Sequence, residues 1–239
     1  CVSFDEPHAP CVAPPEYWEK FSDDDLAFAE RNEEPWQHKP ELQSIHRHQA
    51  TSRRRSREGL RRFFGCNSYI DREIGRVIET VERLHPGDTA ILYTSDHGDM
   101  LGHHGLLSKG PMMYEEICNV PFILRLPNRP PSVSDAVISH LDILPTMLDI
   151  AGLDCPESLH GKSLRPLLEG QVESIHETVL SSFTRFAVNH DDWGEFYPIR
   201  AVTDGRYKLI VNLFDTDEFY DLAADPHETS NEISEVHLA

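Results

Sequence analysis

The clearest periodic pattern in the chain is helical and runs from Leu60 to Leu84. Apolar residues recur there every three or four positions, which places them on one face of a helix. They are Phe63, Phe64, Ile70, Ile74, Val77, Ile78, Val81 and Leu84. The sequence HPGD at 85–88 interrupts the pattern. We therefore predict a long helix with one buried face that ends before residue 85.

Two continuous apolar runs follow this helix. TAILYTS at 89–95 and VPFILRL at 120–126 are typical of strands buried on both faces, as in a parallel sheet. Residues 1–5 are also expected to form a strand. Asp96 and His97 come directly after the run at 89–95. In open α/β sheets ligands bind beyond the carboxyl ends of strands, so this pair is in a favourable position for a site.

The character of the chain changes towards its C-terminus. Asp142 is expected to cap a short helix that stops at Gly152. Beyond it, a hairpin with Asp204-Gly205 at its turn is followed by a strand, a turn and a short helix. We predict an α/β domain over residues 1–170, with an irregular insertion at 22–57, and a small β-hairpin and helix subdomain over 171–239.

Length, composition and charge limit the function classes. The 239 residues are 39% hydrophobic and 26% charged, enough for one α/β domain with an appendage. No apolar run reaches the roughly 18–20 residues of a membrane helix, so we expect no membrane partner. A net charge of −19 argues against nucleic acid as a partner, because phosphate binding needs basic surface. The basic run Arg53–Arg57 leaves a nucleic-acid contact open beside a solvated loop.

The cysteines indicate free thiols. There are five, at positions 1, 11, 66, 118 and 155. An odd number at wide spacing gives neither a disulfide framework nor a zinc knuckle. We expect mostly buried, free thiols in a reducing compartment, which favours the cytoplasm over the periplasm. The chain opens on Cys1 without a methionine, and it reads as the continuation of a longer polypeptide.

The stretch from Thr94 to Glu116 carries the candidate chemistry. Asp96 and His97 offer one oxygen and one nitrogen ligand, a set that suits Mn, Fe or Zn better than Ca; the alternative is a polar surface pair. Lys109 is a compact charge that suits a sulfate or phosphate oxygen, although a lone lysine in a glycine-rich loop is usually solvated.

Three further histidines each allow two interpretations from the residues alone. His103 and His104 are either further metal ligands or loop surface, and we favour loop surface. His8, in the sequence PHAP, is a candidate general acid because histidine titrates near neutral pH. The alternative is a turn histidine without a function.

Several motifs together resemble the second half of a sulfatase, within the alkaline phosphatase superfamily. They are SDHGDMLGHHGLLSKGPMMYEE, VPFILRLP, SHLDILPTMLDIAGL, GKSLRPLLEG and DGRYKLI, and SFDEPHAP resembles the strand and PHxP loop upstream of them. The resemblance implies the second half of an α/β/α sandwich with a small C-terminal β-rich α+β subdomain. It also implies metal ligation by Asp96 and His97, an anion-binding role for Lys109, and a leaving-group role for His8.

The resemblance also implies a cofactor and a reaction. One divalent metal ion is expected, Mn or Ca foremost and Zn or Fe as further choices. An Asp-His pair at this place is similar to phosphonate monoester hydrolases, so sulfate esters, phosphodiesters and phosphonates all remain candidate substrates. Among sulfate esters, a sulfated sugar or an aryl or alkyl ester is expected. Homo-oligomers are compatible with the family.

One family element is absent from the chain. The nucleophile of these enzymes is a formylglycine made from Cys or Ser in C/S-x-P/S-x-R, and no cysteine here has Arg at the fifth place. We therefore expect the nucleophile in a missing N-terminal half or a partner chain, and an inactive chain on its own. The alternative is a non-catalytic, truncated relative that acts as a binding module. The segment 185–200, with His190 and Arg200, is either a sugar-contacting loop or hairpin surface.

Overall fold

The computed structural model describes residues 1–26, 38–52, 57–184 and 197–235. The chain divides into two compact units. The first unit holds residues 1–34, 45–109 and 116–131, and the second holds 35–44, 110–115 and 132–239. These units are defined by contacts between residues, whereas the boundary expected near residue 170 was placed where the sequence changes from helical to β-rich. That boundary therefore stays a prediction. In the described ranges, no helix is both long and apolar enough to cross a membrane.

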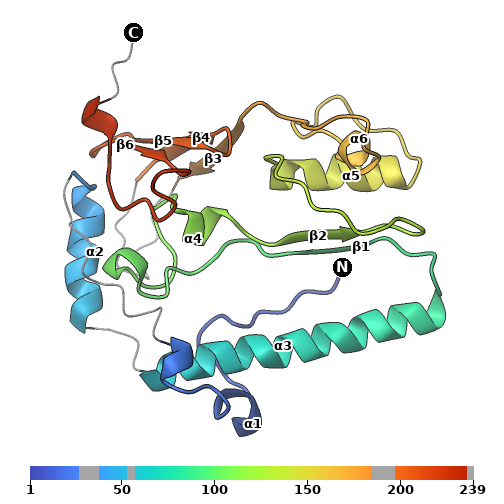
Figure 1. Ribbon diagram of the computed structural model, residues 1–239, viewed down its shortest axis with the longest axis horizontal. Helices are drawn as coiled ribbons and strands as arrows, with labels where there is room; N and C mark the ends of the chain where they lie inside the picture. The colour runs from blue at the N-terminus through green and yellow to red at the C-terminus, as the bar shows by residue number, and fades with distance from the viewer. Residues whose placement is uncertain (27–37, 53–56, 185–196, 236–239) are drawn as a thin grey trace. The chain divides into compact units, whose positions relative to one another are not determined.

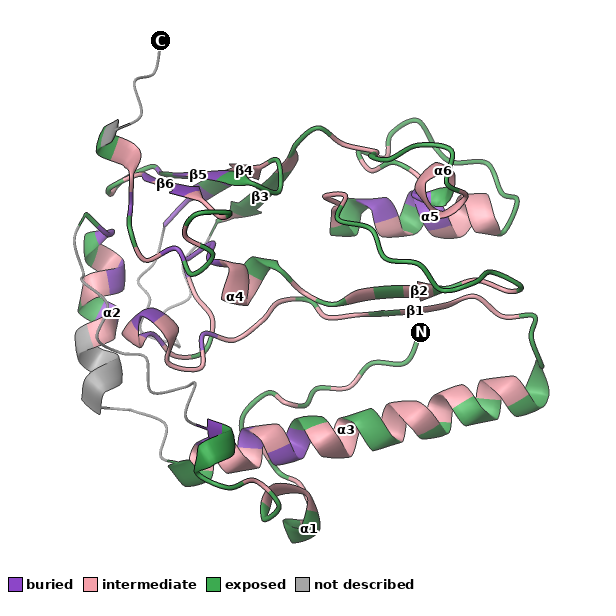
Figure 2. Ribbon diagram, viewed as in Figure 1, coloured by how far each residue is buried: buried purple, intermediate pink, exposed green. Residues whose placement is uncertain are grey.

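The long helix of the first unit confirms the periodic pattern. The α3 helix spans Arg57–Leu84, and its buried residues gather in its N-terminal part (Figure 2). The short helix α1, Pro15–Trp18, packs there: a side chain at Gly65 would collide with Trp18. The Arg62 guanidinium lies 4.6 Å from the centre of the Trp18 ring. Glycine at 65 therefore allows the two helices to approach closely.

The two apolar runs form strands, but the expected parallel arrangement is wrong. The strands β1, Ile91–Thr94, and β2, Phe122–Arg125, pair antiparallel (Figure 1). Tyr93 lies opposite Ile123, and these side chains are 41% and 61% exposed. An apolar run does not by itself reveal strand direction or the burial of both faces. The strand expected at residues 1–5 is absent; that segment has no regular structure.

The second unit contains a four-stranded antiparallel sheet in the order β3-β4-β5-β6. Its strands are β3 (Val179–Phe183), β4 (Ile199–Thr203), β5 (Tyr207–Asn212) and β6 (Glu218–Asp221). Gly205 has φ +93 in the turn between β4 and β5, a conformation that glycine adopts without strain. The predicted hairpin at Asp204-Gly205 is therefore confirmed.

Helices complete the second unit. They are η3 (His140–Asp142), α5 (Ile143–Ile150), α6 (Arg165–Leu168) and η4 (Ile233–Glu235). Asp142 stands at the N-cap of α5 as predicted, but its carboxylate does not cap that helix. The buried carboxylate accepts hydrogen bonds from the Ser139 and Lys162 amides, and His176 Nε2 lies 2.9 Å from its Oδ2. Asp142 thus joins three segments of the second unit.

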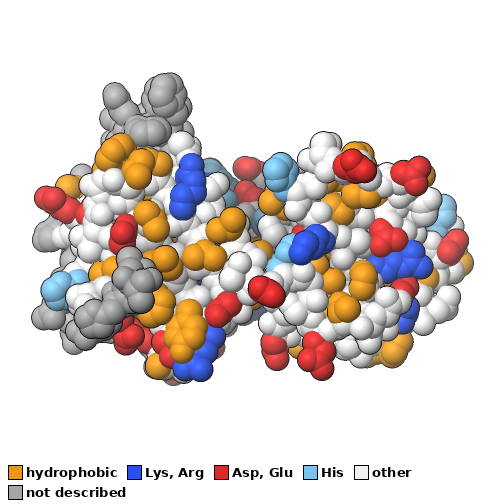
Figure 3. All heavy atoms as spheres, turned by 90° about the horizontal axis from the view of Figure 1, so that it is seen from above, with side chains coloured by type: hydrophobic (Ala, Val, Ile, Leu, Met, Phe, Trp, Pro, Cys, Tyr) orange, Lys and Arg blue, Asp and Glu red, His pale blue; other side chains and the backbone are white. Residues whose placement is uncertain are grey.

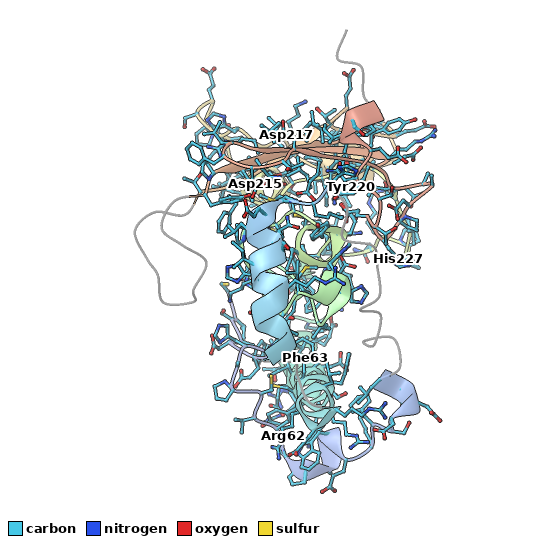
Figure 4. All side chains as sticks on the ribbon, turned by 90° about the vertical axis from the view of Figure 1, so that its left-hand side faces the viewer. Arg62, Phe63, Asp215, Asp217, Tyr220 and His227 are labelled. Carbon is cyan, nitrogen blue, oxygen red and sulfur yellow. The ribbon has the colours of Figure 1, made fainter. Side chains whose placement is uncertain are left out.

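The irregular insertion expected at residues 22–57 is partly wrong. A helix, α2, spans Glu41–Ser52, and residues 27–37 and 53–56 lie outside the described residues. At its N-terminus, Asp215 accepts hydrogen bonds from the Glu41 and Leu42 amides at 2.9 and 3.1 Å (Figure 4). A carboxylate there satisfies amides that lack a partner within the helix. This cap comes from a residue far away in the sequence, so the local pattern could not reveal it.

The cysteine expectation is corrected in part. None of the five cysteines, all of which the structure describes, forms a disulfide, but only Cys66 is buried, while Cys1, Cys118 and Cys155 are exposed. Burial is the main cause that raises the pKa of Cys66 to about 11. The Cys66 thiol is therefore protonated at neutral pH and packs as a small apolar side chain.

The acidic side chains on one face of the structure do not gather in a single patch. On the face seen in Figure 3, acidic side chains lie scattered among hydrophobic, histidine and basic ones. Attraction for an anion therefore has to come from groups at a particular site.

Candidate active site

The Asp96–His97 pair follows β1 (Ile91–Thr94) after one intervening residue, Ser95. The next residue, Gly98, donates its amide hydrogen to the Ile117 carbonyl at 3.0 Å. A side chain at position 98 would collide with the Glu116 carbonyl, so the backbone of 116–117 approaches here only because residue 98 is glycine. The pair therefore projects from a turn that is fixed on both sides, by β1 and by this backbone contact.

The local hydrogen bonds leave one oxygen and one nitrogen of the pair available. The His97 amide donates to Asp96 Oδ1 at 3.0 Å, and His97 Nδ1–H donates to the Gly98 carbonyl at 2.8 Å. Because a carbonyl can only accept, the proton sits on Nδ1 and the lone pair on Nε2. Asp96 Oδ2 and His97 Nε2 are 3.4 Å apart, and the two side chains are 85% and 35% exposed.

This arrangement fits a divalent metal ion. A metal-ligating histidine usually donates its other ring N–H to a carbonyl or carboxylate, as His97 does with Gly98. Two ligands that are each about 2.1 Å from one metal lie roughly 3.0–3.5 Å apart, which matches the separation of Oδ2 and Nε2. Within the described part of the chain, no group of three or more His, Cys, Asp or Glu residues forms a metal site, so a metal held here would need further ligands from elsewhere.

Lys109 ends a closed loop that begins near the pair. The Met100 amide donates to the Ser108 carbonyl at 2.8 Å, which brings the two ends of the loop together. Lys109 is half-buried. Within the described residues it makes neither a hydrogen bond nor an ion pair, so its ammonium group is available to an anionic ligand. Its role stays a prediction.

His8 lies in an exposed turn of the first unit. Its Nδ1 is 2.9 Å from the Ala9 carbonyl, which leaves Nε2 for proton transfer. In the described structure, His8 makes no hydrogen bond or ion pair with Asp96, His97 or Lys109. The general-acid role of His8 stays a prediction.

His103 and His104 correct the expectation of loop surface. They lie in η2, His103–Gly105, and His104 is only 2% exposed. His103 Nδ1 is 2.8 Å from Glu116 Oε1, and His104 Nε2 is 3.9 Å from Glu116 Oε2. Sequence reasoning missed Glu116, which lies in α4, Glu115–Cys118. The one available signal was an acidic pair at the end of the glycine-rich stretch.

The structure describes the remaining candidate residues only in part. Most of the basic run Arg53–Arg57 lies outside the described residues, as do His190 and most of 185–200. Arg57 forms an ion pair of 3.0 Å with Asp23. Arg200 is exposed on β4, where its guanidinium donates to Thr184 Oγ1 at 3.1 Å and to the Ile199 carbonyl at 2.8 Å.

Comparison with solved structures defines the class of protein. The phosphonate monoester hydrolase of Agrobacterium radiobacter matches 98% of this chain and 52% of its own, with 26% identity and a TM-score of 0.78. The structure of BT4656 in complex with its substrate D-glucosamine-2-N,6-O-disulfate matches 73% of this chain and 36% of its own, with 31% identity and a TM-score of 0.65. The expected fold class, an alkaline-phosphatase-like α/β architecture, is thereby confirmed.

Sequence comparison defines the family. The sulfatase family model matches residues 1–153, and the model for N-sulphoglucosamine sulphohydrolase, C-terminal, matches residues 102–239. The chain belongs to the sulfatase family. The uncharacterized sulfatase YidJ of Escherichia coli K12 is 37% identical over 100% of this chain and 47% of its own length. The chain spans about half the length of the curated relatives it matches.

Proposed function

We propose that the native protein is a metal-dependent sulfuric-ester hydrolase of the formylglycine type. The observation that carries this proposal is the convergence of Asp96 Oδ2 and His97 Nε2, 3.4 Å apart, at the end of β1 in a chain of the sulfatase family. Asp96 and His97 would hold one divalent metal ion. Mn is favoured over Ca because an imidazole nitrogen is part of the ligand set.

Each proposed residue has a separate task. The metal, when bound, supplies positive charge to a sulfuryl oxygen of the substrate. Lys109 would add a second positive charge against the negative charge that develops in the transition state. His8 would donate a proton to the leaving oxygen through Nε2, since Nδ1 is engaged with the Ala9 carbonyl. In an otherwise acidic chain, these groups provide the local attraction for an anion.

The nucleophile of this proposal comes from outside the 239 residues. None of the five cysteines has Arg at the fifth place of a C-x-P/S-x-R segment. A formylglycine and further acidic metal ligands would come from an N-terminal half or a partner chain. Without them, this chain alone would not turn over a substrate.

A sulfated sugar is the favoured substrate class. The support is the match to the N-sulphoglucosamine sulphohydrolase C-terminal model over residues 102–239 and the similarity to a structure bound to D-glucosamine-2-N,6-O-disulfate. Phosphonate monoester hydrolysis is the second candidate, and it is favoured by the Asp-His pair together with the TM-score of 0.78 to a phosphonate monoester hydrolase. A non-catalytic binding module is the third.

A substrate panel separates these functions. The native polypeptide, loaded with Mn²⁺ and checked for formylglycine by peptide mass mapping, is assayed with an aryl sulfate, N- and O-sulfated glucosamine, an aryl phosphonate monoester and an aryl phosphodiester. We expect kcat/KM for a sulfate ester to exceed that for the phosphonate by tenfold or more. The reverse order would assign the phosphonate activity. No turnover in a protein that carries formylglycine would assign the binding module.

Lys109→Ala tests the proposed anion contact. We expect kcat/KM for the preferred ester to fall by about 10²–10³-fold, as when one charged or hydrogen-bonding contact to a developing anion is lost. Lys20→Ala removes another lysine of the first unit, one whose ammonium lies 5.2 Å from the centre of the Phe21 ring, and should leave kcat/KM unchanged. A loss of less than tenfold for Lys109→Ala would count against the role of Lys109.

A further inference from the structure

The Glu116 carboxylate lies between the segment that carries the Asp96–His97 pair and the loop that ends at Lys109. Its side chain is 17% exposed. Glu116 Oε1 lies 2.8 Å from His103 Nδ1, and Glu116 Oε2 lies 3.9 Å from His104 Nε2. Burial by itself raises the pKa of Glu116, but the hydrogen bond from His103 and the charges of both histidines outweigh it, so the pKa is lowered overall. The carboxylate is therefore ionised at neutral pH.

The backbone around Glu116 fixes the pair from one side. The Ile117 carbonyl accepts the hydrogen bond from the Gly98 amide, and the Glu116 carbonyl lies so close to Gly98 that no side chain fits there. Gly98 in turn holds the ring of His97, because its carbonyl accepts the Nδ1–H hydrogen bond. A shift of residues 116–117 would therefore move the ring that presents Nε2.

The side chain of Glu116 fixes the lysine loop from the other side. The loop folds on itself through hydrogen bonds from the His103 amide to the Met100 carbonyl at 2.7 Å and from the Leu106 amide to the His103 carbonyl at 2.9 Å. Met100 and Leu106 are fully buried. These contacts connect the loop to η2, and η2 is held by Glu116 through His103.

The backbone of this loop needs such external support. Three of its non-glycine residues, Leu101, His104 and Ser108, have φ of 48, 54 and 61. Non-glycine residues in this left-handed region are strained and persist only where their surroundings determine them. Ser108 directly precedes Lys109, so the direction in which the lysine leaves the loop depends on this support.

We propose that Glu116 is a positioning residue that sets the spacing between the Asp96–His97 pair and Lys109. It acts through Gly98 on the pair and through His103 and His104 on the lysine loop, and it touches neither metal nor substrate. The inference rests on the proposed function, since it concerns the same site.

The test measures Mn²⁺ binding to the native polypeptide by isothermal titration calorimetry and, separately, KM and kcat for the preferred ester. We expect Glu116→Ala to weaken Mn²⁺ binding by roughly 10–100-fold, the range typical for groups that orient metal ligands, and to raise KM. Glu116→Gln retains an oxygen for His103 Nδ1 and should restore most of both values. His103→Ala removes the same contact from the other partner and should weaken Mn²⁺ binding by a similar factor.

A matched control removes a different contact of the first unit. Glu82, on α3, forms an ion pair with Arg125 on β2, and Glu82→Ala should leave Mn²⁺ affinity and KM unchanged. If Asp96→Asn abolishes Mn²⁺ binding while Glu116→Ala and His103→Ala bind within twofold of the unaltered protein, the positioning role is overturned and the proposed metal site stands. If the unaltered protein does not bind Mn²⁺, both the proposed function and this inference fail.

Discussion

His97→Ala is expected to lower kcat/KM for the preferred ester by about a thousandfold, because the metal contributes several kcal/mol of charge stabilisation and tenfold in rate corresponds to about 1.4 kcal/mol. The substitution removes the one ring nitrogen that is left available by the hydrogen bond from Nδ1 to the Gly98 carbonyl. Mn²⁺ affinity measured by calorimetry should fall together with turnover. Asp96→Asn should have a similar effect, since it neutralises the other ligand of the pair.

A control has to separate the effect of losing any histidine from the effect of losing a metal ligand. His85 is exposed just beyond the end of α3, and His85→Ala should change neither Mn²⁺ affinity nor turnover. If His97→Ala binds Mn²⁺ within threefold of the unaltered protein, His97 is not a ligand, whatever happens to turnover.

Lys208→Met is expected to lower the free energy of unfolding by about 3–5 kcal/mol, the range for removing one partner of a buried ion pair. The Lys208 side chain is 3% exposed. Its ammonium lies 2.8 Å from Glu228 Oε1 and 2.6 Å from Glu115 Oε1, and it donates to the Met113 carbonyl at 3.0 Å. Burial lowers the pKa of Lys208, but Glu228 and Glu115 outweigh this effect and raise it overall. Methionine would remove the ammonium group that contacts the fully buried Glu228 carboxylate.

The loss of unfolding free energy in Lys208→Met is expected to grow as pH rises. Burial raises the pKa of Glu228 to about 7 even beside Lys208, well above the usual value of about 4.3. A raised folded-state pKa means that the contribution to stability is fully present below the unfolded pKa and is lost as pH rises through the folded one. The Lys208→Met variant should therefore be least stable above pH 7 and should recover as pH falls towards 5, where Glu228 takes up a proton.

Urea unfolding followed by circular dichroism at pH 5, 7 and 8 measures this effect. Arg206→Met is the matched control, because Arg206 is on the same hairpin and forms an exposed ion pair with Asp221 at 2.9 Å. Such surface pairs contribute about 0–1 kcal/mol. Adding Glu228→Gln to Lys208→Met should restore part of the stability. Equal losses for Lys208→Met and Arg206→Met would contradict the argument.

Lys208 and Glu228 also contact the chain segment that follows Lys109. Lys208 holds the Met113 carbonyl and the Glu115 carboxylate, and the Glu228 carboxylate accepts from the Glu115 amide at 2.7 Å. Tyr114 is fully buried and donates to Gln43 Oε1 at 2.7 Å. Its ring centre lies 6.3 Å from that of Tyr220, which is labelled in Figure 4. The segment that follows Lys109 along the chain is thus anchored in the core of the second unit.

Local patterns were sufficient for the elements whose stability is local. The 3.6-residue period predicted α3, and the Asp204-Gly205 turn predicted the β4–β5 hairpin, because amphipathic periodicity and turn chemistry act within a few residues. The same holds for Asp96 and His97. Their place directly after an apolar run was visible in the sequence, and the hydrogen bonds that orient them come from residues 97 and 98.

Long-range contacts account for what the sequence did not reveal. The helix α2 begins where Asp215 supplies its cap, and β1 pairs antiparallel with β2 across about thirty residues. Glu116 and His103 are thirteen residues apart, yet they meet at 2.8 Å. The long helix, the hairpin and the place of Asp96 and His97 after an apolar run could be read from the sequence, because each depends on neighbouring residues, and the motifs along the chain indicated the family. The strand direction, the burial of His104 and the contacts of Glu116 could not be read from it, because each depends on which distant segments pack together.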